Sequence, residues 1–241
     1  MTNLKNAPFQ AGPSPQIHLT HLPPIPTYEE SLVAPRPTAL QILGATWGGV
    51  TVTPDIQALI GDLDNDTLTL DLRSLHRILS PDPAPGTVKV LTVLYRFGDD
   101  EAGQERLLVV SEDAQTARVV VDRGAAAAAI VPGRGASGRG VVLHGKLGRA
   151  WRAGERGEVE VVAAVFGPRR IEDPAVLVEL GEYFEGRRRQ VRMTNAFWGG
   201  DPWPYKKKSW TVYFRFVGSK RVQVVTGWED GALEVPWSRD W

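Results

Sequence analysis

The sequence contains no cysteine, which excludes disulfide bonds, thiolate catalysis and cysteine-ligated metal sites. It also has no net charge, because 28 Lys and Arg balance 28 Asp and Glu. Nucleic-acid-binding proteins usually carry a basic excess, so we expect no nucleic-acid partner. No run of 18 apolar residues and no apolar N-terminal signal segment occurs, so we expect no membrane span and a cytoplasmic protein.

Motifs for catalysis and metal binding are missing as well. Two of the four histidines, His76 and His144, stand outside the Pro-rich N-terminus, whereas a zinc site needs three or four clustered ligands. The chain has no Gly-x-Ser-x-Gly elbow and no Gly-Lys-Ser/Thr phosphate loop. We therefore predict no catalytic residue, no metal and no cofactor, and a protein that binds rather than catalyses.

The N-terminal residues 1–37 are rich in proline, with eight of the 18 prolines of the chain. This density removes backbone donors and blocks helices, so we predict a disordered tail. Its segment PPIPTYEES (residues 23–31) resembles the tyrosine-containing motifs that WW domains bind, with Pro24, Pro26 and Tyr28 as the candidate contacts. The alternative is a solvated tail without a partner.

An internal repeat with an offset of 119 residues is the strongest pattern in the chain. The segment ILGATWG (residues 42–48) aligns with VVAAVFG (residues 161–167), and DPAP (residues 82–85) aligns with DPWP (residues 201–204). At the same offset Lys89 aligns with Lys208, and YRF (residues 95–97) aligns with FRF (residues 214–216). Several markers sharing one offset indicate a tandem duplication.

Both repeats are typical of β-structure. Segments rich in β-branched and aromatic residues, some alternating in polarity, predict strands at residues 68–72, 88–97, 106–111, 189–193, 209–216 and 221–226. Residues 54–60 and 174–180 predict a short helix or turn after the first strand of each repeat, and residues 141–147 predict an additional strand. The alanines of residues 125–129 favour a helix.

We therefore predict an all-β protein of two tandem β-sandwich-like domains related by internal duplication, behind a disordered tail. The predicted boundaries are residues 1–37 for the tail, 38–122 for the first domain, 123–140 for an Ala/Gly-rich linker and 141–241 for the second domain. The sequence leaves open whether the two repeats share a core.

The order of these motifs resembles a known family. A hydrophobic-Ala-x-aromatic-Gly segment, a helical turn, Asp-Pro-x-Pro and Lys-x-x-x-Val-x-aromatic are similar to the C-terminal domain of unknown function in J-domain co-chaperones of the DnaJ subfamily C member 11 type. The segment FWGGDPWP (residues 197–204) followed by Lys208 carries the best match. The resemblance implies a stand-alone, fungal-like protein. Because the chain has no His-Pro-Asp tripeptide, it implies no J-domain activity.

The loop DPWPY (residues 201–205) is the main candidate site. Two prolines stiffen it, and aromatic rings next to lysines are typical of binding surfaces. The candidate ligand-binding residues are Trp198, Asp201, Trp203, Tyr205, Lys206 and Trp228. The alternative is architectural, since the first repeat keeps Asp82 and both prolines but has Ala84 in place of tryptophan.

Three hypotheses about function follow. The first is a non-enzymatic interaction module that recognises a protein partner through the Pro-rich tail and the Trp-rich loop. The second is a carbohydrate-binding protein in which Trp198, Trp203 or Trp228 stacks on a sugar. The third is an enzyme with a pocket between the two repeats, involving Asp201, His76 or His144.

Overall fold

A computed structural model describes residues 40–60, 66–79, 81–98, 104–114, 116–123, 129–132, 142–152, 157–188 and 190–234 of the chain. All of these belong to one compact unit, Arg36–Trp241. The predicted tail, with Pro24, Pro26 and Tyr28, lies outside the described residues, and so do Trp237 and Trp241.

Three antiparallel sheets make up the described part of the chain, which confirms the all-β prediction. The first sheet has the order β2 (Val50–Thr51), β1 (Leu40–Trp47), β4 (Val90–Phe97), β5 (Arg106–Ser111) and β8 (Val142–Lys146). The second has the order β11 (Arg169–Arg170), β10 (Val159–Phe166), β12 (Ser209–Phe216) and β13 (Gln223–Trp228), with β9 (Trp151–Arg152) also paired to β10. The third contains β3 (Leu68–Asp71), β6 (Thr116–Val121) and β7 (Ala129–Pro132).

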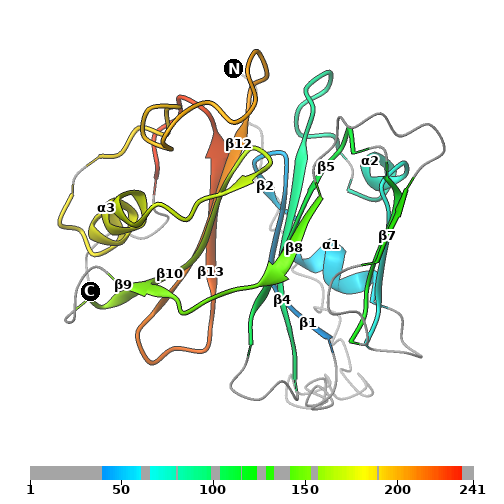
Figure 1. The fold of residues 1–241 in the computed structure, drawn as a ribbon, viewed down its shortest axis with the longest axis horizontal. Coiled ribbons are helices and arrows are strands. Elements are labelled where there is room, and N and C mark those ends of the chain that lie inside the picture. The colour runs from blue at the N-terminus through cyan, green and yellow to red at the C-terminus, as the bar shows by residue number, and fades with distance from the viewer. Residues whose placement is uncertain are drawn as a thin grey trace, which may run out of the picture. The chain divides into compact units, whose positions relative to one another are not determined.

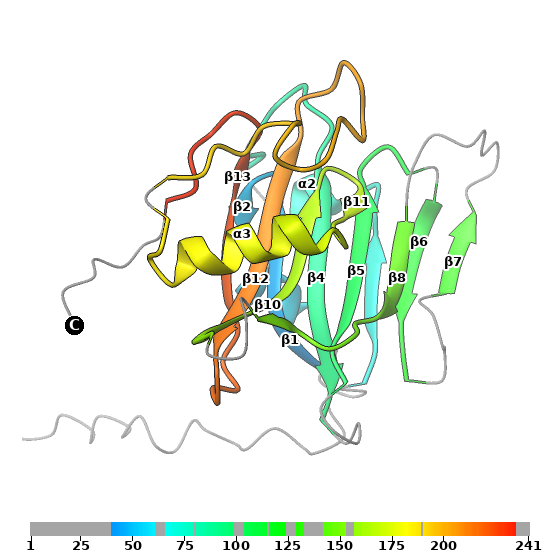
Figure 2. The ribbon, with the colours of Figure 1, turned by 60° about the vertical axis from the view of Figure 1, so that its left-hand side comes forward.

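The helices cover the outer faces of the first two sheets (Figure 1). On one side, α1 (Thr53–Ala58), α2 (Leu75–Ile78) and the third sheet pack against the first sheet around Trp47, Ile56 and Tyr95. On the other side, α3 (Pro174–Phe184) runs across the second sheet (Figure 2) and contributes Leu180 to a core with Phe214. Helix α3 begins where the Asp173 side chain accepts a hydrogen bond from the Ala175 N–H, and proline follows the cap directly. No helix in the described ranges is long and apolar enough to cross a membrane.

The first and second sheets repeat the same pairing 119 residues apart. In the first, Leu40 pairs with Phe97 and Trp47 with Leu91, and in the second Val159 pairs with Phe216 and Phe166 with Trp210. Even the register shift recurs, between residues 42 and 44 and between residues 161 and 163. The two halves therefore share strand order and register, while their origin by duplication stays a prediction.

The two central sheets pack against each other and share a core. Successive side chains of a strand point to opposite faces, so β4 directs Thr92, Leu94 and Arg96 toward the second sheet. Leu94 joins Tyr213 and Val165 in one cluster of buried residues that draws on both sheets. The halves of this compact unit thus share hydrophobic core, the point that the sequence left open.

Buried hydroxyl groups join the two sheets inside this shared core. The Thr46 hydroxyl lies 2.8 Å from the Thr92 hydroxyl and 2.8 Å from the Thr211 hydroxyl, and Thr92 lies 2.5 Å from the Tyr213 hydroxyl. Burial raises the pKa of Tyr213 far above its usual value, although hydrogen bonds with Thr92 and Thr46 partly offset this rise. Since buried hydroxyls need partners, this network favours one docked arrangement of the sheets.

Two segments differ from their predicted structure. Residues 190–193 form no strand, although Val191 and Met193 are buried and Arg192 is exposed, as the alternation predicted. The neighbouring chain offers only the single bridge Arg192–Ala232, so no ladder forms. The predicted linker contains β7, which pairs with β6; Ala129 is thus in a strand, and residues 124–128 of the predicted helix lie outside the described residues.

The predicted additional strand is present as β8, but its partner lies in the first half. It pairs with β5, with Arg106 opposite Lys146 and Val110 opposite Val142. Residues assigned from sequence to the second domain therefore complete the sheet of the first half.

Candidate functional site

Two loops at the same end of the central sheets carry the repeated Asp-Pro motif. We call residues 82–89 the first Asp-Pro loop and residues 201–208 the second Asp-Pro loop (Figure 1). In each, the aspartate Oδ1 accepts a hydrogen bond from the backbone N–H two residues later: Ala84 N–H at 2.9 Å for Asp82 and Trp203 N–H at 2.8 Å for Asp201. This is an Asx-turn, which sets the direction of the loop before proline stiffens it.

A buried lysine closes each loop. The Lys208 ammonium lies 2.9 Å from Asp201 and 3.0 Å from Glu229, and it donates to the Lys206 carbonyl at 2.8 Å. Its side chain is only 2% exposed. The Lys208 ammonium therefore connects the loop, at the Asp201 carboxylate and the Lys206 carbonyl, to Glu229 at the end of β13.

The first Asp-Pro loop has the same arrangement. The Lys89 ammonium lies 3.2 Å from Asp82 and 3.2 Å from Glu112, and it donates to the Thr87 carbonyl at 2.8 Å. The aliphatic part of Lys89 passes over Gly48, where a Cβ atom would lie 2.7 Å from Lys89 Cγ. Since Gly48 also has φ +52°, glycine is required there on two grounds.

The electrostatics of the second loop follow from these contacts. Hydrogen bonds from the Lys208 ammonium and the Trp203 N–H lower the pKa of Asp201. Burial alone would lower the pKa of Lys208, but its bonds to Asp201 and Glu229 raise it instead. Both shifts favour the charged forms of Asp201 and Lys208, so the carboxylate of Asp201 is engaged in the architecture of the loop.

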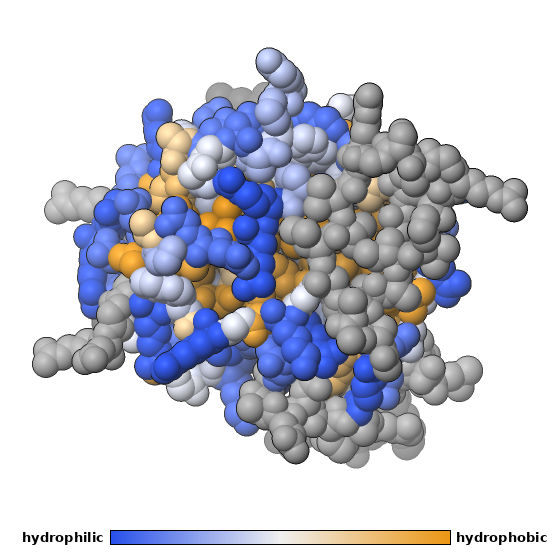
Figure 3. Space-filling view, viewed as in Figure 1, coloured by the Kyte–Doolittle hydropathy of each residue, from blue (hydrophilic) through white to orange (hydrophobic). Residues whose placement is uncertain are grey.

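The tips of the two loops differ in one respect. Tyr205 has φ 67° at the position where the first loop has Gly86 with φ 75°. A left-handed backbone suits glycine, whereas for a residue with a Cβ atom it costs about 1–2 kcal/mol. The Tyr205 side chain is fully exposed, with a relative accessibility of 105%. The tip therefore carries a fully exposed aromatic ring on strained backbone. Figures 1 and 3 show this loop projecting beyond the sheets.

Trp203 and Lys206 connect the second loop to the first half. The Lys206 ammonium lies 2.6 Å from Asp113, which follows β5, and 4.0 Å from the centre of the Trp203 ring. Trp203 is half-buried and packs against the shared core. Both candidate residues thus stabilise the contact between the halves.

The other two candidate tryptophans also have protein neighbours. Trp198 is 1% exposed and stacks on Phe166 at 5.4 Å between ring centres, so its ring offers no face to a ligand. Trp228 lies over Gly49, where a Cβ atom would stand 2.8 Å from the indole nitrogen. Of the six candidate residues, Tyr205 is the one with a large side chain that has no packing role.

At the opposite end of the central sheets lies a cavity that sequence reasoning did not identify. Its volume is about 540 Å³, and its lining includes Gln41, Arg96, Glu105, Glu160, Arg215 and Lys220. It lies between the halves, as the enzyme hypothesis expected, but neither Asp201 nor His76 lines it, and the His144 side chain is outside the described residues.

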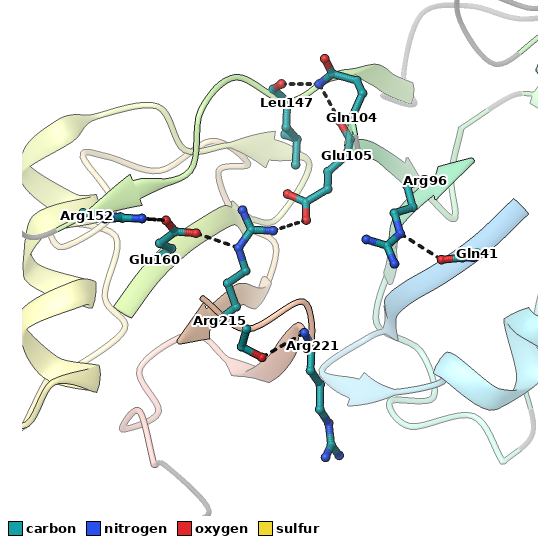
Figure 4. Close-up of polar contacts among 10 residues, drawn as sticks. Gln41, Arg96, Gln104, Glu105, Leu147, Arg152, Glu160, Arg215 and Arg221 are labelled. Carbon is teal, nitrogen blue, oxygen red and sulfur yellow. Dashed lines mark hydrogen bonds and ion pairs between the residues drawn. The ribbon is translucent and has the colours of Figure 1, made fainter. Parts of the chain in front are cut away.

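One wall of this cavity is a chain of alternating charges (Figure 4). Arg152 bonds to Glu160 at 2.7 Å, and Glu160 accepts a further bond of 2.7 Å from Arg215, which also reaches Glu105. Burial would raise the pKa of Glu160, but the two arginines lower it. For Glu105 burial prevails and the pKa is raised.

Sequence reasoning missed the role of Lys89 and Lys208, although both were markers of the repeat. The available signal was that each lysine recurs together with an Asp-Pro motif seven residues before it. The acidic partners Glu112 and Glu229 stand 117 residues apart, outside the common offset, because the intervening hairpin loops differ in length.

No protein-family model, curated protein or solved structure matches this chain. The resemblance to the co-chaperone C-terminal domain therefore stays a prediction. Within the residues that the structure describes, no group of three or more His, Asp or Glu side chains is placed to hold a metal ion.

Proposed function

We propose that this protein is a non-enzymatic binding module that recognises a protein partner through the tip of the second Asp-Pro loop. Tyr205 is the central contact. The observation that carries the proposal is a fully exposed tyrosine ring on left-handed backbone, at a position where the equivalent loop has glycine.

The left-handed backbone at Tyr205 has an energetic cost that no contact of its side chain offsets in the folded protein. Strained backbone persists where the surrounding structure enforces it, and it is common at ligand-contacting positions. Here Lys208 and its two carboxylates enforce the loop shape, while the Tyr205 ring makes no packing contact in return. A rigid loop loses little entropy on binding, so such a tip suits recognition.

The chemistry around the tip indicates the kind of partner. Tyrosine supplies a large amphipathic surface with few rotatable bonds, and it is common among residues that dominate binding energy. Pro204 and Lys207 beside it are exposed, whereas Lys206 is already paired with Asp113. A protein surface with an apolar pocket for the ring and a carboxylate near Lys207 fits this tip.

The variant Tyr205→Gly tests the proposal, because it removes the ring and relieves the backbone together. We expect its free energy of unfolding to equal the wild-type value or exceed it by up to about 1 kcal/mol. The immobilised variant should lose a protein that the wild type retains from a source lysate, as measured by quantitative mass spectrometry. The control is Ile78→Ala, which changes another exposed apolar side chain, on α2.

Two results would refute the proposal. One is the recovery of the same proteins by the wild type and by Tyr205→Gly. The other is a wild type that retains nothing beyond what an unrelated control protein retains. A photo-crosslinker placed at position 205, compared with one at position 78, then identifies the surface that the partner touches.

The Pro-rich tail is a second proposed contact. Its motif with Pro24, Pro26 and Tyr28 would bind a WW domain as a polyproline helix. Deleting residues 1–37 should remove a WW partner and leave the partner of the Tyr205 tip unaffected, so the two contacts can be separated. The aromatic rings that a sugar would need are packed against protein, so the structure adds no support to carbohydrate binding.

A further inference from the structure

We infer that the cavity at the other end of the sheet interface binds a small organic anion, and that Arg96 is the residue that holds its carboxylate or phosphate group. This site is separate from the Tyr205 tip and does not depend on the function proposed for it. Its volume of about 540 Å³ lies within the range of small-molecule sites.

Two equivalent arginines line the cavity, one from each half. Arg96 on β4 and Arg215 on β12 occupy the same register position, 119 residues apart, and both line the cavity. Their partners on the neighbouring strands are also equivalent: Gln41 opposite Arg96 and Glu160 opposite Arg215.

The two arginines differ in the charge of their partners. Arg215 Nε bonds to the Glu160 carboxylate at 2.7 Å and a second nitrogen bonds to Glu105, so its charge is matched twice. Arg96 Nε bonds at 2.9 Å to Gln41, which is a neutral amide. Among the described residues, Arg96 forms no ion pair.

The unmatched guanidinium faces the cavity. Figure 4 shows the Arg96 guanidinium on the side of its strand that faces Glu105 and Arg215, with one terminal nitrogen directed toward them. A guanidinium presents several N–H donors in a planar fork that matches the oxygens of a carboxylate or phosphate. Lys220, exposed at the rim, adds a second positive charge for the same ligand.

The carboxylates of the wall are hydrogen-bonded to other arginines, although the charge of Arg96 also acts on Glu105 and offsets part of the rise that burial causes in the pKa of that carboxyl. Glu160 is held between Arg152 and Arg215, and Glu105 Oε1 accepts from Arg215. The second Glu105 oxygen is the acceptor left for a hydroxyl or amine elsewhere on the ligand. A small molecule with one anionic group and one donor group therefore suits the cavity better than a neutral one.

Substitution of Gln41 by glutamate offers a sharp test. The variant Gln41→Glu gives Arg96 the partner that Arg215 already has, so it neutralises the guanidinium without removing it. Arg96→Gln removes the charge directly. Arg77→Gln removes a positive charge from α2, away from the cavity lining, and controls for long-range electrostatics.

Isothermal titration at low salt would measure binding of inorganic phosphate, succinate and neutral glycerol to the four proteins. We expect saturable binding of phosphate or succinate, and none of glycerol. Arg96→Gln and Gln41→Glu should weaken that binding about tenfold to a hundredfold, the effect of one hydrogen-bonded charge pair, and Arg77→Gln should not. Thermal unfolding shows whether the variants stay folded.

Binding of phosphate alone supports a phosphate ester as the ligand, and binding of succinate alone supports a carboxylic acid. The inference is overturned if neither anion saturates the wild type below about 10 mM, or if folded Arg96→Gln and Gln41→Glu bind as the wild type does.

Discussion

Replacing the buried Lys208 by methionine tests how the second Asp-Pro loop is held. Methionine keeps the length of the side chain and removes the ammonium, which leaves Asp201 and Glu229 without their shared cation. Removing one partner of a buried ion pair costs about 3–5 kcal/mol. Because Asp201 is one-third exposed and can be solvated, we expect the lower end for Lys208→Met, about 3 kcal/mol.

The free energy of unfolding would be measured by urea titration, followed by tryptophan fluorescence and circular dichroism. For a protein of this size the expected loss corresponds to a decrease in Tm of about 6–12 °C. The matched control is Lys207→Met, one residue away and exposed, for which we expect a change within about 0.5 kcal/mol.

Two further variants make the test specific. Lys89→Met in the first loop should cost about as much as Lys208→Met, because each ammonium has two carboxylates and two loop carbonyls as partners, the carbonyls of Ala84 and Thr87 for Lys89 and those of Trp203 and Lys206 for Lys208. Adding Glu229→Gln to Lys208→Met should recover part of the loss, since one uncompensated carboxylate is removed. If Lys208→Met and Lys207→Met unfold at the same urea concentration, the loop does not depend on its lysine and the reasoning is wrong.

Three more predictions concern packing and titration. Gly44→Ala should destabilise the protein by about 1–3 kcal/mol in urea unfolding, because a Cβ atom would stand 2.9 Å from the Tyr213 ring, whereas Gly145→Ala, with no atom within 4 Å, should cost less than 1 kcal/mol. Because the pKa of Tyr213 is raised in the fold, its contribution to the free energy of unfolding is complete below the usual pKa of 10.0 and is lost as the pH rises above that value. Tyrosinate absorbance from Tyr213 should therefore appear only when the protein unfolds. The pKa values of Asp201 and Glu160 are lowered in the fold, so their contribution to stability has the opposite pH dependence. It is present above the usual pKa values of 3.8 and 4.5 and is lost as the pH falls below about 4. Wild-type stability that does not change across the alkaline or the acidic range would contradict these assignments.

The sequence predicted strands well where a segment both alternates in polarity and recurs at the common offset. Residues 88–97 and 209–216 were predicted as strands on both grounds, and they form β4 and β12. Residues 189–193 alternate but have no counterpart in register, and the structure shows only burial of Val191 and Met193 without a ladder. Alternation reports which side chains are buried, and a strand also needs a neighbour with free backbone groups.

The features of the candidate sites were harder to predict because they depend on contacts between halves. The sequence alone cannot distinguish a buried aromatic residue from an exposed one. In the structure Trp198 lies in the core, whereas the side chain of Tyr205 is fully exposed. The sequence shows that a neutral Gln41 stands where the second repeat has the acidic Glu160. Only the structure shows that both residues line the same cavity, which makes the difference in charge relevant to binding.

The pairing of β8 with β5 has a consequence for how the chain is made. During synthesis β5 is made before residues 142–146, so its outer edge has no β8 to pair with until those residues follow. Such an edge is a template for pairing with other chains. A fragment that ends at residue 122 should therefore self-associate through the open edge of β5, whereas one extended through residue 147 covers that edge with β8. Both fragments still expose the face of the first sheet that packs against the second sheet.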